Sequence, residues 1–379
     1  MAIHTLEKMD ELEKGELLVV QESRGTGLEE KHGRRKTYYK IMLAIAVFFL
    51  LWQSNIFTCA RPTTISRQVL GVPQYALDYA PFVYLDIREE FFPSDMLAQI
   101  TNTHPEINLT SIDDPPEPLT LHNLDSLNQF GNGGMNVYLT SNIPVTSSPT
   151  WLTGIVPDST GKTNNAISCA VIMHDRGSGL VDVFYMYFYA YNQGNTVLLQ
   201  ELGDHIGDWE HNMIRFQDGE PQAIWYSQHG NGQAFTYNAA QKIGTRPISY
   251  SALGSHANYA IAGTHDHTIP DLNLPAGFIL DYTSKGMLWD PTLSTYFYNY
   301  HGDTGSFESI NGSPLGAMDF KGKWGDEQYP KEDPKQPPPF FGFMKYVSGP
   351  TGPWDKQLNR TKICPDNGIL CIIRDELGP

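Results

Sequence analysis

The chain has 379 residues, enough for one large domain or two ordinary ones, and it contains 20 Tyr, 18 Phe, 34 Gly and 26 Pro. Many turn-forming and aromatic residues favour a mainly β globular fold over a helical one. The formal net charge is −16, and residues 1–40 hold eight basic and eight acidic side chains, so the whole excess lies in the rest of the chain. Such an acidic surface repels phosphate backbones and attracts cations, which excludes nucleic-acid binding.

The N-terminal part is organised as a polar tail followed by a hydrophobic segment. Residues 1–40 are polar and mixed in charge, and we expect a disordered tail. Residues 41–60 carry no charge and are long enough to span a bilayer. Basic residues cluster just before this segment, so the positive-inside rule predicts a signal-anchor with a cytosolic N-terminus and a lumenal large domain. A cleaved signal peptide and a buried core helix are the alternatives.

Three sequons and a closely spaced pair of cysteines follow the hydrophobic segment. Asn108, Asn311 and Asn359 each begin an Asn-X-Ser/Thr triplet and are candidates for glycosylation in a lumenal domain. Cys364 and Cys371 lie seven positions apart and can close a small disulfide loop in an oxidising compartment.

The remainder of the chain is predicted to fold into one β domain. We expect a stalk over residues 61–76, the domain over 77–360 and a C-terminal tail over 361–379. Runs of β-branched and aromatic residues predict strands at 81–85, 166–173, 179–192, 208–216, 223–230 and 246–260, with polar loops over 101–165. Strands joined by short turns indicate an antiparallel β-sandwich with long loops. The aromatic residues of 321–379 predict an ordered segment packed on it.

The stretch Gly203–Phe216, GDHIGDWEHNMIRF, concentrates titratable side chains at the start of a predicted strand. Period-2 geometry places Asp208 and Glu210 on one face, which is apolar further along the strand. Two carboxylates directed toward a core need a proton, an arginine or a metal ion to neutralise them. Two glycines allow a turn that brings His205 beside them. His205, Asp208 and Glu210 are therefore the predicted metal ligands; solvated acids with a capping histidine are the alternative.

Other histidines lie at turns after predicted strands. Because strand ends on one rim of a sandwich converge, His229, His256 and His265 are candidates for contacting a ligand or supporting the metal ligands. Oxygen-rich ligands favour calcium or magnesium over zinc. The sequence has no nucleophile elbow, zinc-protease, P-loop or dinucleotide signature, so we expect a binding protein. A metal-dependent hydrolase using the same residues, and a structural adaptor without metal, remain alternatives.

Several blocks of sequence resemble the vacuolar protein sorting-associated protein 62 family. They are YAPFVYLDIREEFFPSD, GDWEHNMIRF, WYSQHG, RPISYSALGSHANYAIAGTH and KWGDEQYP, and they occur in order between Leu77 and Asp355. The resemblance implies a role in vacuolar protein sorting and no particular biochemical activity. Together with the predicted anchor, it implies a single-pass type II membrane protein of the secretory or vacuolar pathway.

A more local resemblance concerns the acidic stretch itself. HIGDWEHNMIRF followed by WYSQHG is similar to the G-H-R-H-D-W-E signature of the necrosis- and ethylene-inducing peptide-like proteins, β-sandwiches that hold a divalent cation at the rim and bind sphingolipid sugar headgroups. The resemblance implies ligands at His205, Asp208 and Glu210. It places Gly207 where the signature has a second histidine. A further acidic ligand of the signature would fall near Asn192, which is not acidic. The resemblance thus implies a cation site and a polar ligand, a glycan or a lipid headgroup, without implying toxin activity.

Overall fold

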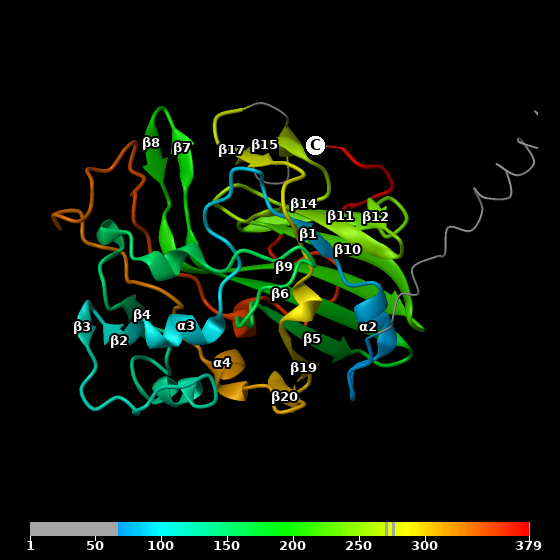
Figure 1. Cartoon of the computed structure of the whole chain (residues 1–379), viewed down its shortest axis with the longest axis horizontal. Helices are drawn as coiled ribbons and strands as arrows, with labels where there is room; N and C mark the ends of the chain where they lie inside the picture. Colours follow the sequence, from blue (N-terminus) through cyan, green and yellow to red (C-terminus); the bar gives the residue numbers. More distant parts are fainter. Residues whose placement is uncertain (1–66, 270–271, 275–276, 379) are drawn as a thin grey trace, which may run out of the picture. The chain divides into compact units, whose positions relative to one another are not determined.

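The computed structural model describes residues 67–269, 272–274 and 277–378 (Figure 1). These residues belong to one compact unit that runs from Ser66 to Pro379. The predicted tail over 1–40 and signal-anchor over 41–60 lie outside the described residues. Within the described part of the chain, no helix is both long enough and apolar enough to cross a membrane.

An eight-stranded sheet forms the centre of the fold, in the order β20-β19-β5-β6-β9-β10-β11-β21 (Figure 1). Its strands are β5 (Cys169–Asp175), β6 (Leu180–Asn192), β9 (His205–Gln217), β10 (Glu220–Gln228), β11 (Asn231–Thr236), β19 (Thr295–His301), β20 (Ser306–Ile310) and β21 (Ile373–Arg374). The two longest strands, β6 and β9, have 13 residues each and pair from one end to the other. The valine, tyrosine and phenylalanine residues of β6 suit a pleated surface buried on both faces.

A smaller sheet packs on one face of the central sheet and completes a sandwich. It consists of β1 (Phe82–Tyr84), β12 (Lys242–Ile243), β13 (Arg246–Ser251), β14 (Asn258–Tyr259) and β18 (Leu288–Trp289). The core between the two sheets includes Val83, Tyr185, Tyr187 and Trp289. The structure thus confirms the mainly β, sandwich-like class.

The sandwich is not purely antiparallel, which corrects that part of the prediction. Three pairs of strands run parallel: β1 with β13, β5 with β19, and β11 with β21. In each pair the two strands are far apart in the sequence. No hairpin joins them, so no tight turn imposes the antiparallel direction.

The opposite face of the central sheet is covered by short elements and loops. They are α3 (Met96–Thr101), β2 (Thr103–Ile107), β3 (Thr110–Ser111), η1 (Leu124–Gln129), β4 (Tyr138–Ser141), η2 (Val145–Ser147), η3 (Thr150–Thr153) and α4 (Leu315–Asp319). Trp209 and Met213 of β9 pack on this side with Met96, Leu124 and Met318. The segment 101–165 is therefore a covering layer of loops and short strands, as its polar composition predicts.

The remaining elements lie at the edges of the sandwich. They are α2 (Gln74–Asp78), β7 (Asn195–Val197), β8 (Gln200–Leu202), β15 (Gly263–Ile269), β16 (Leu272–Leu274), β17 (Leu280–Thr283), η4 (Pro291–Leu293) and η5 (Pro353–Asp355). The β7–β8 hairpin and the β15–β16–β17 sheet border the candidate site.

The segments predicted as stalk and tail both take part in the compact unit. Helix α2 begins at Gln74, inside the predicted stalk. Beyond residue 360, Ile363 and Cys364 are buried in the core, and a disulfide joins Cys364 to Cys371. The prediction that the aromatic residues of 321–379 pack on the sandwich holds for Trp324, which is fully buried. It does not hold for Phe341 and Phe343, whose side chains are 75% and 60% exposed.

Candidate functional site

Strand β9 directs its acidic residues toward the space between the two sheets. Asp208 and Glu210 pair with Tyr189 and Tyr187 of β6, and cross-strand partners share a face. On the same face Asn212 accepts a hydrogen bond from the Tyr187 hydroxyl at 2.9 Å. Further along, this face is apolar, with Ile214 and Phe216 in the core. The predicted alternation of β9 is therefore confirmed. His211 lies on the other face and is not part of this site.

Asp208 is paired with His256, which is fully buried. The Nδ1 atom of His256 lies 3.0 Å from an Asp208 carboxylate oxygen, and Nε2 donates to the carbonyl oxygen of Phe91 at 2.9 Å. The imidazole stacks on Tyr189 with 3.7 Å between ring centres. Burial alone would lower the pKa of His256, but the hydrogen bond to Asp208 and the nearby carboxylate of Glu89, 3.8 Å from Nε2, raise it to about 10. The resulting imidazolium neutralises Asp208.

Glu210 forms no ion pair of this kind with any described residue; Lys356 and His229 favour its ionised form but do not outweigh its burial and the charge of Asp208. Its side chain is buried, and its Oε2 atom has no hydrogen-bond partner. Burial and the nearby charge of Asp208 raise the pKa of Glu210 to about 8. A buried carboxylate oxygen without a partner costs free energy, which a proton or a bound cation removes.

His205 is the first residue of β9 and is not in a preceding turn, contrary to the prediction. Its Nδ1 donates to the carbonyl oxygen of Gly207 at 2.7 Å, which leaves Nε2 as the free acceptor of the neutral ring. Burial lowers the pKa of His205 and keeps it neutral. Asn192 lies opposite His205 on β6, where its side-chain amide donates to the carbonyl oxygen of Gly203 at 3.1 Å.

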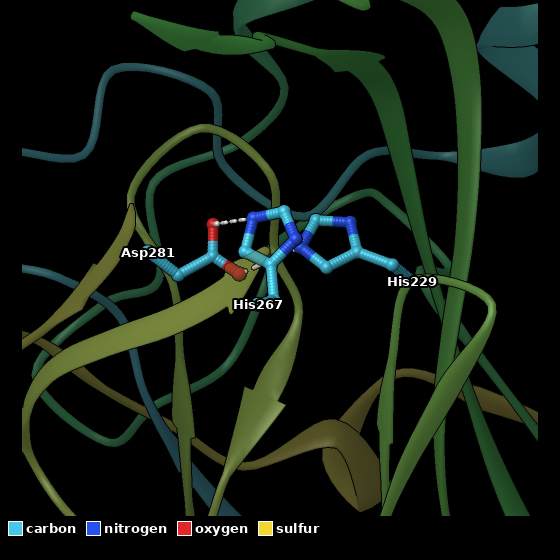
Figure 2. Close-up of side chains that lie close together, drawn as sticks. All are labelled: His229, His267 and Asp281. Atoms are coloured by element: carbon cyan, nitrogen blue, oxygen red, sulfur yellow. Dashed lines mark hydrogen bonds and ion pairs between the residues drawn. The ribbon is translucent and has the colours of Figure 1, made fainter. Parts of the chain in front are cut away.

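A second cluster of titratable residues lies near Glu210 and joins three separate elements. Among the described residues, His229, His267 and Asp281 have ligand atoms that all lie within 4.8 Å of one another (Figure 2). The predicted set of His205, Asp208 and Glu210 does not form such a group in the described structure. His229 comes from the turn after β10, His267 from β15 and Asp281 from β17.

Asp281 is the centre of this second cluster. It is fully buried and accepts hydrogen bonds from His229 Nε2 at 2.7 Å, the Tyr259 hydroxyl at 2.7 Å and the Ser255 hydroxyl at 2.8 Å. Burial opposes ionisation, yet the charge of His229 and its hydrogen bond hold the pKa of Asp281 well below its usual range. Burial likewise opposes protonation of His229, but Asp281 raises its pKa to about 9. In contrast, burial and the charge of His229 lower the pKa of His267 to about 4.

His265 supports this cluster indirectly. Its ring stacks on Tyr259 with 3.8 Å between centres, and its Nε2 lies 2.9 Å from the Thr283 hydroxyl. Tyr259 in turn donates to Asp281. The sequence thus singles out His256, which contacts Asp208, and His229 and His265, which belong to or support the second cluster. It does not predict the partners of these histidines. The sequence does not predict the role of Asp281, because ILDYTS has the pattern of an ordinary strand. Asp281 reaches the cluster only through the pairing of β15 with β17.

Comparison with known proteins identifies the family. A sequence profile described as vacuolar protein sorting-associated protein 62 matches residues 161–274. The putative vacuolar protein sorting-associated protein TDA6 of Saccharomyces cerevisiae is 34% identical over 323 residues, which are 77% of this chain and 68% of that protein. This chain belongs to the vacuolar protein sorting-associated protein 62 family. Vacuolar protein sorting-associated protein 62 of the same yeast is 33% identical over 332 residues, 79% of this chain and 68% of the relative.

Among solved structures, a crystal structure of the non-toxic HaNLP3 protein aligns with 61% of this chain and 77% of its own, at 10% identity and a TM-score of 0.26. The segment that matches the profile of the vacuolar protein sorting-associated protein 62 family contains Asp208, Glu210, His229 and His267. Asp281 lies beyond the end of that segment.

Proposed function

We propose that this member of the vacuolar protein sorting-associated protein 62 family acts in vacuolar protein sorting by binding a divalent cation and, through it, a polar ligand. The names of the two yeast relatives support the cellular role. The observation that carries the cation proposal is the buried Oε2 atom of Glu210, which has no hydrogen-bond partner. A cation at this point would remove the cost of burying that oxygen.

Asp208, Glu210 and His205 would hold the ion after their side chains move closer together, because their ligand atoms do not form such a group in the described structure. The two carboxylates share the inward face of β9, and the hydrogen bond from His205 Nδ1 to Gly207 leaves Nε2 available for a metal. Carboxylate oxygens in the majority favour calcium or magnesium. A glycan or a lipid headgroup is the proposed ligand, since its hydroxyl or phosphate oxygens can complete the coordination of such an ion.

The proposed setting is the lumen of the secretory or vacuolar pathway. The uncharged segment over 41–60 would anchor the chain, with the domain that begins at Ser66 on the lumenal side. The disulfide between Cys364 and Cys371 fits an oxidising compartment.

Calcium and magnesium titration of the purified full-length protein tests the proposed site. Asp208→Asn combined with Glu210→Gln should abolish calorimetric binding of the ion and the cation-dependent capture of glycans or headgroup-bearing vesicles. Asp303→Asn combined with Glu332→Gln removes the same charge from two exposed positions and should change neither. Equal binding by both double variants would show that the ion lies elsewhere, and chelator-sensitive turnover of phosphate or glycosyl esters would favour the hydrolase instead.

A further inference from the structure

We propose that His229, His267 and Asp281 form a second metal site, separate from the calcium or magnesium site proposed above, and that it takes a transition-metal ion such as Zn²⁺. The three residues come from three different strands or turns and meet at one carboxylate (Figure 2). None of them belongs to the ligand set on β9.

Both imidazoles direct the same ring nitrogen at the same carboxylate. His229 Nε2 lies 2.7 Å from one oxygen of Asp281, and His267 Nε2 lies 3.8 Å from the other. The two rings stack with 4.0 Å between their centres. An ion placed among these three groups would take the place of the proton that His229 donates to Asp281, and that proton would leave to the solvent.

Neighbouring residues fix the orientation of the proposed ligands. The buried Asp281 carboxylate is held by the hydroxyls of Ser255 and Tyr259, so it needs no rearrangement to face the two histidines. Asn195 donates its side-chain amide to Asp281 at 3.0 Å, and its amide oxygen lies 3.2 Å from His267 Nε2. That oxygen is placed to act as a fourth ligand. Such outer hydrogen bonds are characteristic of built metal sites.

The cluster is also accessible from outside. The side chains of His229 and His267 are 32% and 25% exposed, which provides a path for an ion. His267 and Asn195 also line a cavity of about 460 Å³ whose other walls are apolar and include Phe340 and Phe343. An ion bound here would therefore lie at the wall of a cavity large enough for a small ligand.

The ligand chemistry decides the class of metal. Two imidazole nitrogens with one carboxylate suit zinc and related transition metals, whereas calcium and magnesium prefer oxygen ligands. The two proposed sites therefore differ in selectivity as well as in position. The competing interpretation is a hydrogen-bonded cluster that only ties the β10–β11 turn to β15 and β17.

Titration of the full-length protein with Zn²⁺, and with Co²⁺ as a spectroscopic probe, separates these interpretations. We expect one Zn²⁺ per chain and a visible Co²⁺ absorption band typical of nitrogen and oxygen ligands. His267→Gln keeps the bond between His229 and Asp281, so the fold should persist, while Zn²⁺ affinity should fall at least about tenfold and the Co²⁺ band should be lost. His229→Gln should have the same effect on both readouts.

Two controls keep the result specific. His301→Gln removes an exposed histidine that also faces an acid, Glu308, at 3.3 Å, and should leave Zn²⁺ affinity unchanged. Asp208→Asn combined with Glu210→Gln should abolish calcium or magnesium binding and spare the Co²⁺ band. If wild-type protein and His267→Gln bind Zn²⁺ equally, or if His301→Gln weakens binding as much, the proposed site is refuted.

Discussion

Gly207 lies directly against the carbonyl oxygen of Trp324, so that a Cβ atom at position 207 would come within 2.0 Å of that oxygen. The backbone of Gly207 also has a φ of +68°, which L-residues adopt only at a cost. No side chain fits here, which explains why this chain has glycine where the similar signature has a second histidine.

Gly207→Ala should lower the free energy of unfolding by about 3 kcal/mol, from the steric overlap and the left-handed backbone together. Urea denaturation measures this change. Gly203→Ala is the matched control, because Gly203 has a φ of +94° but no atom within 4 Å of its Cβ position. Gly203→Ala should lower the free energy of unfolding only by the backbone strain, about 1 kcal/mol. Similar costs for the two variants would contradict a steric role for Trp324.

The fold follows from the sequence where strand periodicity is long and regular. The alternation of β9 correctly predicts which of its residues face the second sheet, because β9 is 13 residues long and pairs with β6 throughout. The direction of β1, β19 and β21 could not be predicted in this way. Each joins a strand distant in the sequence, and strand composition alone does not determine whether such a pair is parallel.

In the candidate site, too, local features could be predicted from the sequence and long-range contacts could not. The inward direction of Asp208 and Glu210 is a local property of one strand and was predictable. The partners of His229 and His256 depend on tertiary contacts, and both residues adopt left-handed backbone conformations that take them out of strand alternation. Asp281 carries no local signal, since a single acid in a strand is usually solvated. Only the folded arrangement reveals it as the centre of a cluster.

Glu210→Gln should stabilise the metal-free protein. The unfolded chain ionises Glu210 near its usual value of 4.5, but the folded chain keeps the proton up to a pKa of about 8. The cost of this residue to stability is therefore absent below pH 4.5 and grows as the pH rises toward 8. At pH 7, in the presence of a chelator, the variant should gain on the order of 1–3 kcal/mol in urea denaturation.

The pH dependence distinguishes this effect from a general gain in packing. The advantage of Glu210→Gln should be small at pH 4 and largest near pH 8. Glu332→Gln, at an exposed position, should show no comparable trend. A gain that is constant between pH 4 and pH 8 would contradict the assignment of a buried, protonated Glu210.

Asn108 is the sequon most accessible to glycosylation. All three sequon asparagines are exposed, but the side-chain amide of Asn311 donates to Leu70 at 2.9 Å and that of Asn359 donates to Gly302 at 2.7 Å, so only the amide of Asn108 is not held by the fold in this way. If the domain is lumenal, the protein from cells should carry a glycosidase-sensitive mass that Asn108→Gln removes. Asn311→Gln should leave that mass in place. A wild-type protein with no such mass, and with its domain cleaved by protease added to the cytosolic side, would contradict the lumenal topology.

Arg246 and Asp290 form a bidentate ion pair that joins β13 to the start of η4, with both nitrogen–oxygen distances at 2.7 Å. Arg246 also donates from Nε to the carbonyl oxygen of Ala80 at 2.7 Å. Asp290→Asn leaves this arginine without its charged partner in a largely buried setting. We expect a loss of about 3 kcal/mol in the free energy of unfolding at pH 7.

The loss should depend on pH in a defined direction. Burial opposes ionisation of Asp290, but its hydrogen bonds with Arg246 hold its pKa below the usual 3.8. The contribution of the ionised carboxylate is therefore complete above pH 3.8 and disappears as the pH falls through the lower folded value. Urea denaturation of wild type and Asp290→Asn should differ most at pH 5–7, and the difference should shrink progressively as the pH falls below 3.8. Asp303→Asn, at an exposed position, should match wild type throughout. A difference that persists undiminished at pH 2 would show that Asp290 stabilises the fold by packing and not by its charge.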